Sequence, residues 1–205
     1  FAVNYNIRTK KTFMPKAKSI CLYCGSSANT RESHCTAATE FGTLLASHGI
    51  SLVFGGGRVG LMGLAADAAL KGGGEVIGII PDFLVEREVG HAECTILHTT
   101  HTMHERKQRM AELSDAFVIL PGGLGTLDEA FEIITWKQLG LHDKPIVIAN
   151  IDGYWDALDT LFENMNTEKY LPTGHENLVR SVSTIGNILP AIDAMPAPTI
   201  ELRTK

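Results

Sequence analysis

Short apolar segments alternate along the chain with longer segments in which apolar residues recur at helical spacing. The short segments predict strands at Ser19–Cys24, Ser51–Phe54, Glu75–Ile80, Thr95–Leu97, Ala116–Leu120 and Pro145–Ala149. The stretches between them have room for helices of about 10–18 residues. Because these strands lack a strict alternation of polar and apolar residues, we expect both of their faces to be buried. The pattern therefore predicts an α/β fold with a doubly wound parallel sheet.

The length of the chain indicates a single domain. It has 205 residues, of which 44% are hydrophobic, and this is enough for one sizeable core. A further strand near Leu178–Val182 and a short helix after it would complete the fold, while Pro190, Pro196 and Pro198 are interpreted as marks of a loose tail. We interpret residues 1–17 as an N-terminal extension, a tag or a disordered segment, residues 18–193 as the folded domain, and residues 194–205 as a C-terminal tail.

Charge and composition narrow the class of protein. A formal net charge of -5 argues against a nucleic-acid or membrane-surface binder, since such proteins depend on dense Lys and Arg. No apolar run is long enough to span a bilayer and no secretory leader opens the chain, so we expect a cytoplasmic protein. Cys21 and Cys24 lie inside an apolar run, which argues against a redox pair. His98, His101 and His104 straddle a strand-to-helix junction, so no metal site is expected.

Polar or glycine-rich segments follow several of the predicted strands. Ligands of open parallel sheets bind beyond the carboxyl ends of the strands, where the strand order reverses. At these ends the chain carries Gly25–Ser27, Gly55–Gly60, His101–Lys107 and Pro121–Glu129. We therefore expect these segments to converge on one ligand site, with Gly25 and Ser26 as contacts.

The segment Gly55–Gly60 has the spacing of a dinucleotide-binding fingerprint but stands in the wrong place for one. That fingerprint belongs to the first strand-to-helix turn, whereas this segment follows the second predicted strand. It is not a Walker A loop either, because Leu61 and Met62 occupy the Lys and Ser/Thr positions. A tight turn and a backbone contact with a ligand remain equally good explanations of its glycines.

The segment Pro121–Thr126 predicts a phosphate cradle. Glycines let successive backbone N–H groups face an anion, and the N-terminus of the following helix adds partial positive charge. The alternative is a glycine-rich turn without a ligand. Glu129 has its own alternative, because Thr126–Glu129 has the spacing of a capping box in which Glu129 would only bond the start of a helix.

A second capping box, Thr102–Glu105, predicts a helix that runs to about Leu113. Such a helix places Arg106 on an otherwise apolar stripe with Met103 and Met110. A buried guanidinium is costly unless an anion pairs with it, so we expect Arg106 to meet a carboxylate or a phosphate.

Three of these segments together resemble the LONELY GUY family of cytokinin-activating phosphoribohydrolases, whose members are often mislabelled lysine decarboxylases. The similarity covers about residues 18 to 190 and is carried by Gly55–Gly63, Met103–Lys107 and Pro121–Glu129. It implies a Rossmann-like, nucleotide-binding catalytic domain and a homodimer with sites near the interface. The implied reaction is hydrolysis of the N-glycosidic bond of AMP or N6-substituted AMP, without a cofactor.

The resemblance also assigns residues. It implies that Arg106 and Glu129 form the catalytic pair. Together with the candidates at the strand ends, the predicted substrate-binding residues are Gly25, Ser26, Glu88, Lys107, Gly122, Gly123, Leu124, Gly125, Thr126, Leu127, Asp128 and Thr135. Leu124 stands where plant members usually carry Tyr, which bears on the substituent of the base.

Two other functions compete with this hypothesis. A non-enzymatic nucleotide or molybdenum-cofactor carrier would use a similar Pro-Gly-Gly-x-Gly-Thr loop, although the combination of Arg106 and Glu129 weighs against it. A decarboxylase would require pyridoxal phosphate. The chain is therefore predicted to be a cytoplasmic AMP nucleosidase or cytokinin-nucleotide hydrolase, whose partners are the AMP-like nucleotide, its phosphate and a second copy of the chain.

Overall fold

The computed structural model describes residues 16–88, 90–171, 174 and 177–196, and the side chains of residues 86–88 are not part of the description. The segments 1–15 and 197–205, which hold most of the two predicted tails, lie outside the described residues. Within the described part, no helix is long and apolar enough to cross a membrane.

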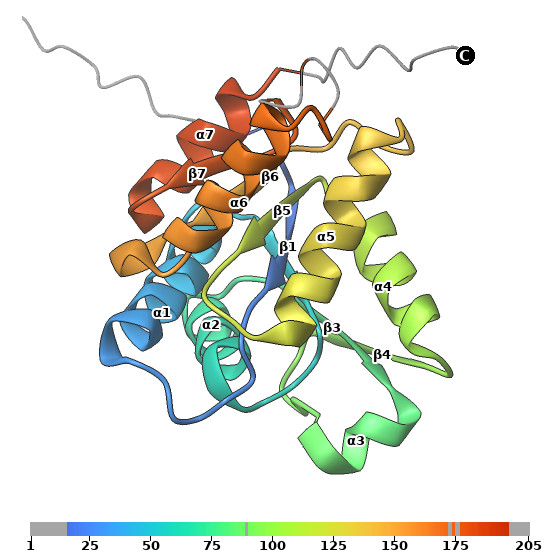
Figure 1. Cartoon of the computed structure of the whole chain (residues 1–205). Helices are drawn as coiled ribbons and strands as arrows, with labels where there is room; N and C mark the ends of the chain where they lie inside the picture. The colour runs from blue at the N-terminus through green and yellow to red at the C-terminus, as the bar shows by residue number, and fades with distance from the viewer. Residues whose placement is uncertain (1–15, 89, 172–173, 175–176, 197–205) are drawn as a thin grey trace, which may run out of the picture.

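A seven-stranded parallel sheet forms the centre of the protein (Figure 1). Its strand order is β4-β3-β2-β1-β5-β6-β7, so the sheet extends from β1 in two directions. The strands are β1 (Ser19–Tyr23), β2 (Ser51–Phe54), β3 (Val76–Pro81), β4 (Ile96–Thr100), β5 (Ala116–Ile119), β6 (Ile146–Ala149) and β7 (Arg180–Val182). The predicted doubly wound α/β fold is confirmed.

Helices cover both faces of this sheet (Figure 1). They are α1 (Glu32–Ser47), α2 (Gly60–Lys71), α3 (Asp82–Glu88), α4 (Met103–Glu112), α5 (Leu124–Gln138), α6 (Asp156–Thr167) and α7 (Ile188–Ala194), with short 3-10 helices at Ile151–Gly153 and Ile185–Asn187. Alternate residues of β1 enter different cores: Ile20 and Leu22 pack with α1, α2 and α7, whereas Cys21 and Tyr23 pack with α4, α5 and α6. This explains why the strand is apolar at every position.

The edge strand β4 differs from its predicted position. The apolar pattern predicted Thr95–Leu97, whereas the strand spans Ile96–Thr100 and pairs along one side with β3. An edge strand keeps one side open, and here Ile96 and Leu97 are 40% and 38% exposed. Polar residues such as His98 and Thr99 are therefore tolerated in the strand, and they hid its extent in the sequence.

The interpretation of Pro190 as part of a loose tail is wrong. Pro190 lies in the first turn of α7, where the backbone N–H has no partner within a helix and the fixed φ of proline is compatible with helical geometry. Its neighbours Leu189 and Ile192 are buried in the core beneath α1 and α2. The last described helix is therefore packed against the sheet.

Lys137 is an unexpected feature of the core. It lies near the C-terminus of α5 with no exposed surface, and its Nζ is 3.3 Å from Sδ of Met195. Burial lowers the pKa of Lys137 to about 8, although the negative charge of Asp143 partly opposes this shift. The ammonium therefore destabilises the folded protein at neutral pH.

We expect Lys137→Met to raise the free energy of unfolding at pH 7 by about 1–3 kcal/mol, because it removes a buried charge of low pKa. The unfolded state binds this proton more tightly than the folded state, so the stability of the unmutated protein should rise with pH from about 8 towards 10.5. The variant should lack that part of the rise.

Urea unfolding between pH 7 and pH 10 would measure both effects, with Lys71→Met at the exposed end of α2 as the matched control. A variant less stable than the unmutated protein at pH 7, or one with an unchanged pH dependence, would contradict this account of Lys137.

Candidate active site

A pocket of about 390 Å³ opens beyond the carboxyl ends of β1 and β5, where the strand order reverses. Gly25 N donates a hydrogen bond of 3.0 Å to Pro121 O and joins the two loops beside the pocket. Three of the predicted strand-end segments contribute to its wall. The lining residues are Cys24, Gly25, Ser26, Ser27, Met62, Leu84, Met103, Arg106, Gly123, Leu124, Gly125, Thr126, Asp128 and Glu129.

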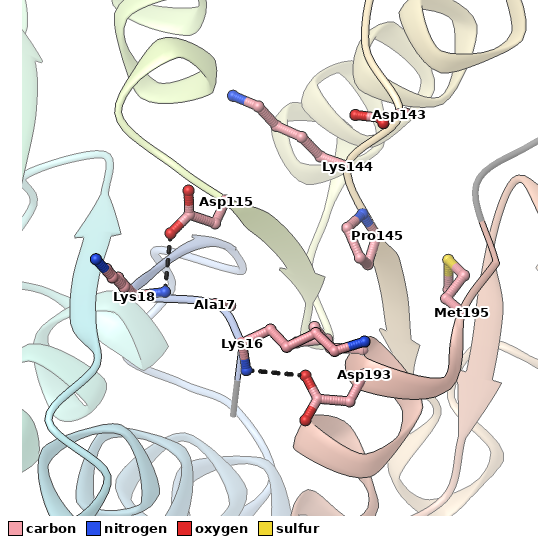
Figure 2. Close-up of a pocket in the computed structure, with 10 residues that line it drawn as sticks. Lys16, Ala17, Lys18, Asp115, Asp143, Lys144, Pro145, Asp193 and Met195 are labelled. Atoms are coloured by element: carbon pink, nitrogen blue, oxygen red, sulfur yellow. Dashed lines mark hydrogen bonds between the residues drawn. The ribbon is translucent and has the colours of Figure 1, made fainter. Parts of the chain in front are cut away.

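A larger pocket, of about 620 Å³, lies at the opposite ends of the strands, where β1, β5 and β6 begin (Figure 2). There the backbone N–H groups of Lys16 and Lys18 donate to the carboxylates of Asp193 and Asp115. Lys16, Lys18 and Asp115 precede strands, Asp193 lies in α7, and both carboxylates already accept backbone hydrogen bonds. Ligands of parallel sheets bind beyond the carboxyl ends of the strands. The larger volume of this pocket therefore does not make it the candidate active site.

The N-terminus of α5 forms one wall of the candidate pocket. The helix begins at Leu124 with Gly123 as its N-cap, and no side chain caps its first turn. Gly123, Gly125 and Thr126 line the pocket. N–H groups in the first turn of a helix lack partners within the helix and carry partial positive charge, so this wall is suited to bind an anion.

The early start of α5 corrects the capping explanation of Glu129. Thr126 is the third residue of the helix and not its N-cap, and Leu127 N already donates to Gly123 O at 3.0 Å. A capping box at Thr126–Glu129 is therefore excluded. Glu129 instead lies in the second turn and lines the pocket.

The glycines of the loop before α5 have different physical roles. A Cβ on Gly122 would lie 2.1 Å from Oγ1 of Thr126 and 2.9 Å from Gly25 N, so close packing requires this glycine. A Cβ on Gly123 or Gly125 would meet no atom within 4 Å. Neither has the positive φ that favours glycine. Their bare backbone therefore leaves space in the pocket, as a phosphate cradle requires.

Arg106 is buried, as its place on the apolar stripe of α4 predicted, and is 5% exposed. Its Nε donates to Ile79 O at 3.1 Å and its Nη2 donates to Gly55 O at 2.8 Å. The guanidinium is thereby held against the ends of β2 and β3 while the side chain lines the pocket with Glu129. Arg106 and Glu129, 23 positions apart in the printed sequence, thus meet at one site.

Packing accounts for Gly55 and Gly60 in the Gly55–Gly60 segment. A Cβ on Gly55 would lie 2.0 Å from Nη2 of Arg106. Gly60 has a φ of +71°, and a Cβ there would lie 2.5 Å from the carbonyl carbon of Ser26. The residues that line the pocket include none from 55 to 60. The tight-turn explanation therefore suffices, and one glycine makes room for Arg106.

The cysteine thiols near the pocket have raised pKa values and are therefore unreactive as nucleophiles. Cys24 lines the pocket, and burial together with the negative charge of Glu129 raises the pKa of its thiol well above the usual value. Burial likewise raises the pKa of Cys21, which lies within β1. Both cysteines are free and protonated at neutral pH, so neither is prepared to act as a nucleophile.

Lys107 joins α4 to α5 beside the pocket. Its Nζ lies 3.1 Å from Oδ2 of Asp128 and 3.1 Å from Oε1 of Glu132. Burial alone would lower the pKa of Lys107, but the hydrogen bonds to Glu132 and Asp128 outweigh it and raise the pKa. Lys107 does not line the pocket itself, whereas its partner Asp128 does.

Of the remaining predicted substrate-binding residues, some line the pocket and others lie away from it. Gly25, Ser26 and Leu124 line the pocket. Leu127 packs against the core between the sheet and α5, and Thr135 is exposed two turns beyond the pocket-lining part of α5. Glu88 is the last residue of α3, and its side chain lies outside the described residues.

The sequence did not indicate Met62 and Leu84, which form the apolar wall of the pocket together with Met103 of the predicted segment His101–Lys107. They occur in helical segments, where apolar residues ordinarily indicate core. The sequence also did not indicate Tyr154, whose hydroxyl donates to Gly122 O at 2.7 Å and so supports the loop before α5. Among the described residues, no group of three or more His, Cys, Asp or Glu side chains could hold a metal ion.

Comparisons with known proteins agree with this geometry. Residues 62–192 match the model of a family described as possible lysine decarboxylase. The chain is 46% identical over 169 residues to the cytokinin riboside 5'-monophosphate phosphoribohydrolase LOG1 of Arabidopsis thaliana, covering 82% of this chain and 79% of that protein. It is 42% identical over 167 residues to the phosphoribohydrolase LOG of Oryza sativa subsp. japonica, covering 82% of this chain and 69% of that protein.

Solved structures support the fold. The molybdenum cofactor carrier protein of Chlamydomonas reinhardtii superposes with a TM-score of 0.65 at 24% identity, covering 86% of this chain and 96% of that one. The molybdenum cofactor binding protein of Rippkaea orientalis gives a TM-score of 0.64 at 23% identity, covering 87% and 95%. At this identity the likeness shows the fold alone.

The glycines of the cradle can be tested as a pair. We expect Gly122→Ala to lower the free energy of unfolding by about 2 kcal/mol, because the new Cβ collides with Thr126 and the β1 loop. Gly125→Ala should leave stability unchanged or raise it by about 0.5–1 kcal/mol, because alanine favours the helix and meets open space. Urea unfolding of both variants measures the difference, and equal effects would contradict the assigned roles.

Proposed function

Because this chain belongs to the LONELY GUY family, as its family match and its identity with LOG1 establish, we propose that it is a phosphoribohydrolase of AMP-like nucleotides. It hydrolyses the N-glycosidic bond of AMP or N6-substituted AMP and releases free base and ribose 5-phosphate. One observation carries the proposal: Arg106 and Glu129 line the same pocket as the N-terminus of α5.

The phosphate of the nucleotide binds at the start of α5. Gly123, Gly125 and Thr126 offer backbone and hydroxyl donors there, and no capping side chain competes for them. The open space at the two glycines admits the phosphate oxygens. Binding at this end directs the ribose along α5 towards Glu129, one turn further on.

Glu129 and Arg106 act on the reacting end of the ribose. The bond between C1′ and the base nitrogen breaks and its electron pair leaves with the base, so positive charge develops on the sugar. The Glu129 carboxylate stabilises this charge and polarises the water whose oxygen bonds to C1′. The water supplies hydroxyl to the sugar and a proton to the departing base. Arg106, held by two carbonyls, orients the anionic groups around it.

The base occupies the apolar side of the pocket. Met62, Leu84 and Met103 provide a surface for a purine and for an apolar N6 substituent. Leu124 lies at the mouth and is 86% exposed, so the outermost part of a substituent can contact it. This arrangement accommodates both AMP and cytokinin nucleotides.

The two alternatives fit the site less well. A carrier of molybdenum cofactor is suggested by the fold of its structural neighbours, but at their low identity only the fold is shared. A pyridoxal-phosphate decarboxylase forms a Schiff base with a lysine, and none of the residues lining the pocket is a lysine. Hydrolysis by Arg106 and Glu129 uses groups that the pocket has.

We also propose that the protein is a cytoplasmic homodimer whose active sites lie near the interface between the two copies. Leu139 and Leu141, just beyond α5, are 53% and 68% exposed. Leu141 borders a shallow pocket of about 320 Å³ with Trp136 and Phe117, between α4 and α5. Exposed apolar surface of this kind is typical of a protein interface, and the same helices line the active site.

We expect Glu129→Gln to lower kcat for hydrolysis of N6-isopentenyl-AMP by about 100-fold or more, because the amide cannot stabilise the charged sugar. Nucleotide affinity should change by no more than about threefold, since the phosphate cradle is untouched. Chromatographic assay of the free base gives the rate, and titration calorimetry gives the affinity.

The matched control for this experiment is Glu40→Gln on the exposed surface of α1. Full turnover by Glu129→Gln with retained binding would contradict the catalytic role of the carboxylate.

We expect Leu141→Asp to convert the dimer into a monomer, because a charge would be buried at the interface. Size-exclusion chromatography with light scattering reads the mass directly. Leu161→Asp, a change at a 42% exposed leucine on α6, is the control and should remain dimeric. A dimer that persists in Leu141→Asp would place the interface elsewhere.

A further inference from the structure

A second pocket, of about 320 Å³, lies on the other side of the phosphate cradle. It shares Gly25, Ser27 and Gly123 with the active-site pocket, so the two cavities meet at the loops after β1 and β5. Its polar residues Asn29, Arg31 and His34 have no part in the proposed reaction. Its lining residues are Gly25, Ser27, Asn29, Thr30, Arg31, His34, Leu61, Pro121, Gly122, Gly123 and Tyr154.

The N-terminus of α1 gives this pocket a positive side. Arg31 is the N-cap of the 16-residue helix, and no side chain caps the first turn. The Arg31 side chain is exposed and contributes to the pocket wall. Partial positive charge at a helix N-terminus and a full charge on a guanidinium both favour an anion, most of all a phosphate.

His34 is a second and independent indication of a ligand. Its side chain lines the pocket, the residue is only 4% exposed, and its Nε2 has no hydrogen-bond partner among the described residues. Burial lowers the pKa of His34, and the charge of Arg31 lowers it further, so the imidazole is neutral at pH 7. An unsatisfied buried nitrogen is costly, and a ligand oxygen would remove that cost after a small rotation of the ring.

Tyr154 connects this pocket to the phosphate cradle. Its ring packs edge-on against the His34 ring, with the centroids 5.2 Å apart. Its hydroxyl donates to Gly122 O at 2.7 Å. A ligand that contacts His34 therefore acts on a side chain whose other end holds the cradle.

We propose that the pocket between Arg31, His34 and Tyr154 is a second anion site, which binds a phosphate monoester separately from the nucleotide in the active site. Arg31 and the first turn of α1 hold the phosphate, and His34 supplies a neutral donor. The site requires no catalytic turnover, so it stands or falls independently of the proposed reaction.

The test uses one reporter in each pocket. Protein labelled at histidine Cε1 and at the methionine methyl group is titrated with inorganic phosphate, and in a second series with ribose 5-phosphate, while NMR follows His34 and Met103. His34 is assigned by the loss of its signal in His34→Asn, and Met103 reports the active-site pocket. We expect both signals to shift saturably, with different midpoints.

Arg31→Gln should weaken the phosphate titration at His34 by roughly tenfold, because a charge-assisted hydrogen bond is lost, and leave the Met103 titration within about twofold. Arg180→Gln on β7 is the matched control and should change neither. Thermal unfolding shows whether each variant is folded.

A His34 signal that does not shift would overturn the proposal. So would a His34 signal that has the same midpoint as Met103 and is unaffected by Arg31→Gln, because a single site could then cause both shifts through Gly123. A response to ribose 5-phosphate but not to inorganic phosphate would mean that the sugar contributes to binding in the second pocket. A response to both would mean that the phosphate group suffices.

Discussion

The contact between the loops after β1 and β5 is the constraint on which the site depends. Gly25 N donates to Pro121 O, and Gly122 approaches Gly25 so closely that a Cβ would not fit. The contact lies where the sheet extends in two directions, so chain connections leave a cavity beside it. The same contact holds the start of α5 beside the cavity, so the N–H groups of its first turn, which have no partner within the helix, face the cavity.

The buried Arg106 connects the β2–β3 side of the sheet to the same pocket. Arg106 comes from α4 and donates to carbonyls at the ends of β2 and β3, and Gly55 is bare because the guanidinium occupies the space of a side chain. The hydrogen bonds to the carbonyls of Ile79 and Gly55 offset part of the cost of burying this charge. The two residues to which we assign the proposed reaction, Arg106 and Glu129, therefore line the same pocket.

The sequence predicted the fold and most of the residues that line the candidate pocket, because both depend largely on local patterns. Apolar runs located the sheet, and the capping box at Thr102 located α4 and so the buried Arg106. It left the role of Glu129 open, since the start of α5 depends on Gly123 and on a tertiary contact that spacing does not reveal. Tyr154 and the apolar wall at Met62 and Leu84 were also beyond reach, because long-range packing brings them to the loop.

In the proposed reaction this pocket breaks a nucleotide at its N-glycosidic bond. Its most direct test incubates the purified protein with AMP and with N6-isopentenyl-AMP in separate reactions and resolves the products by chromatography. We expect equal amounts of free base and ribose 5-phosphate from at least one of the two nucleotides. Tight binding of both nucleotides without release of base would contradict it and favour a carrier.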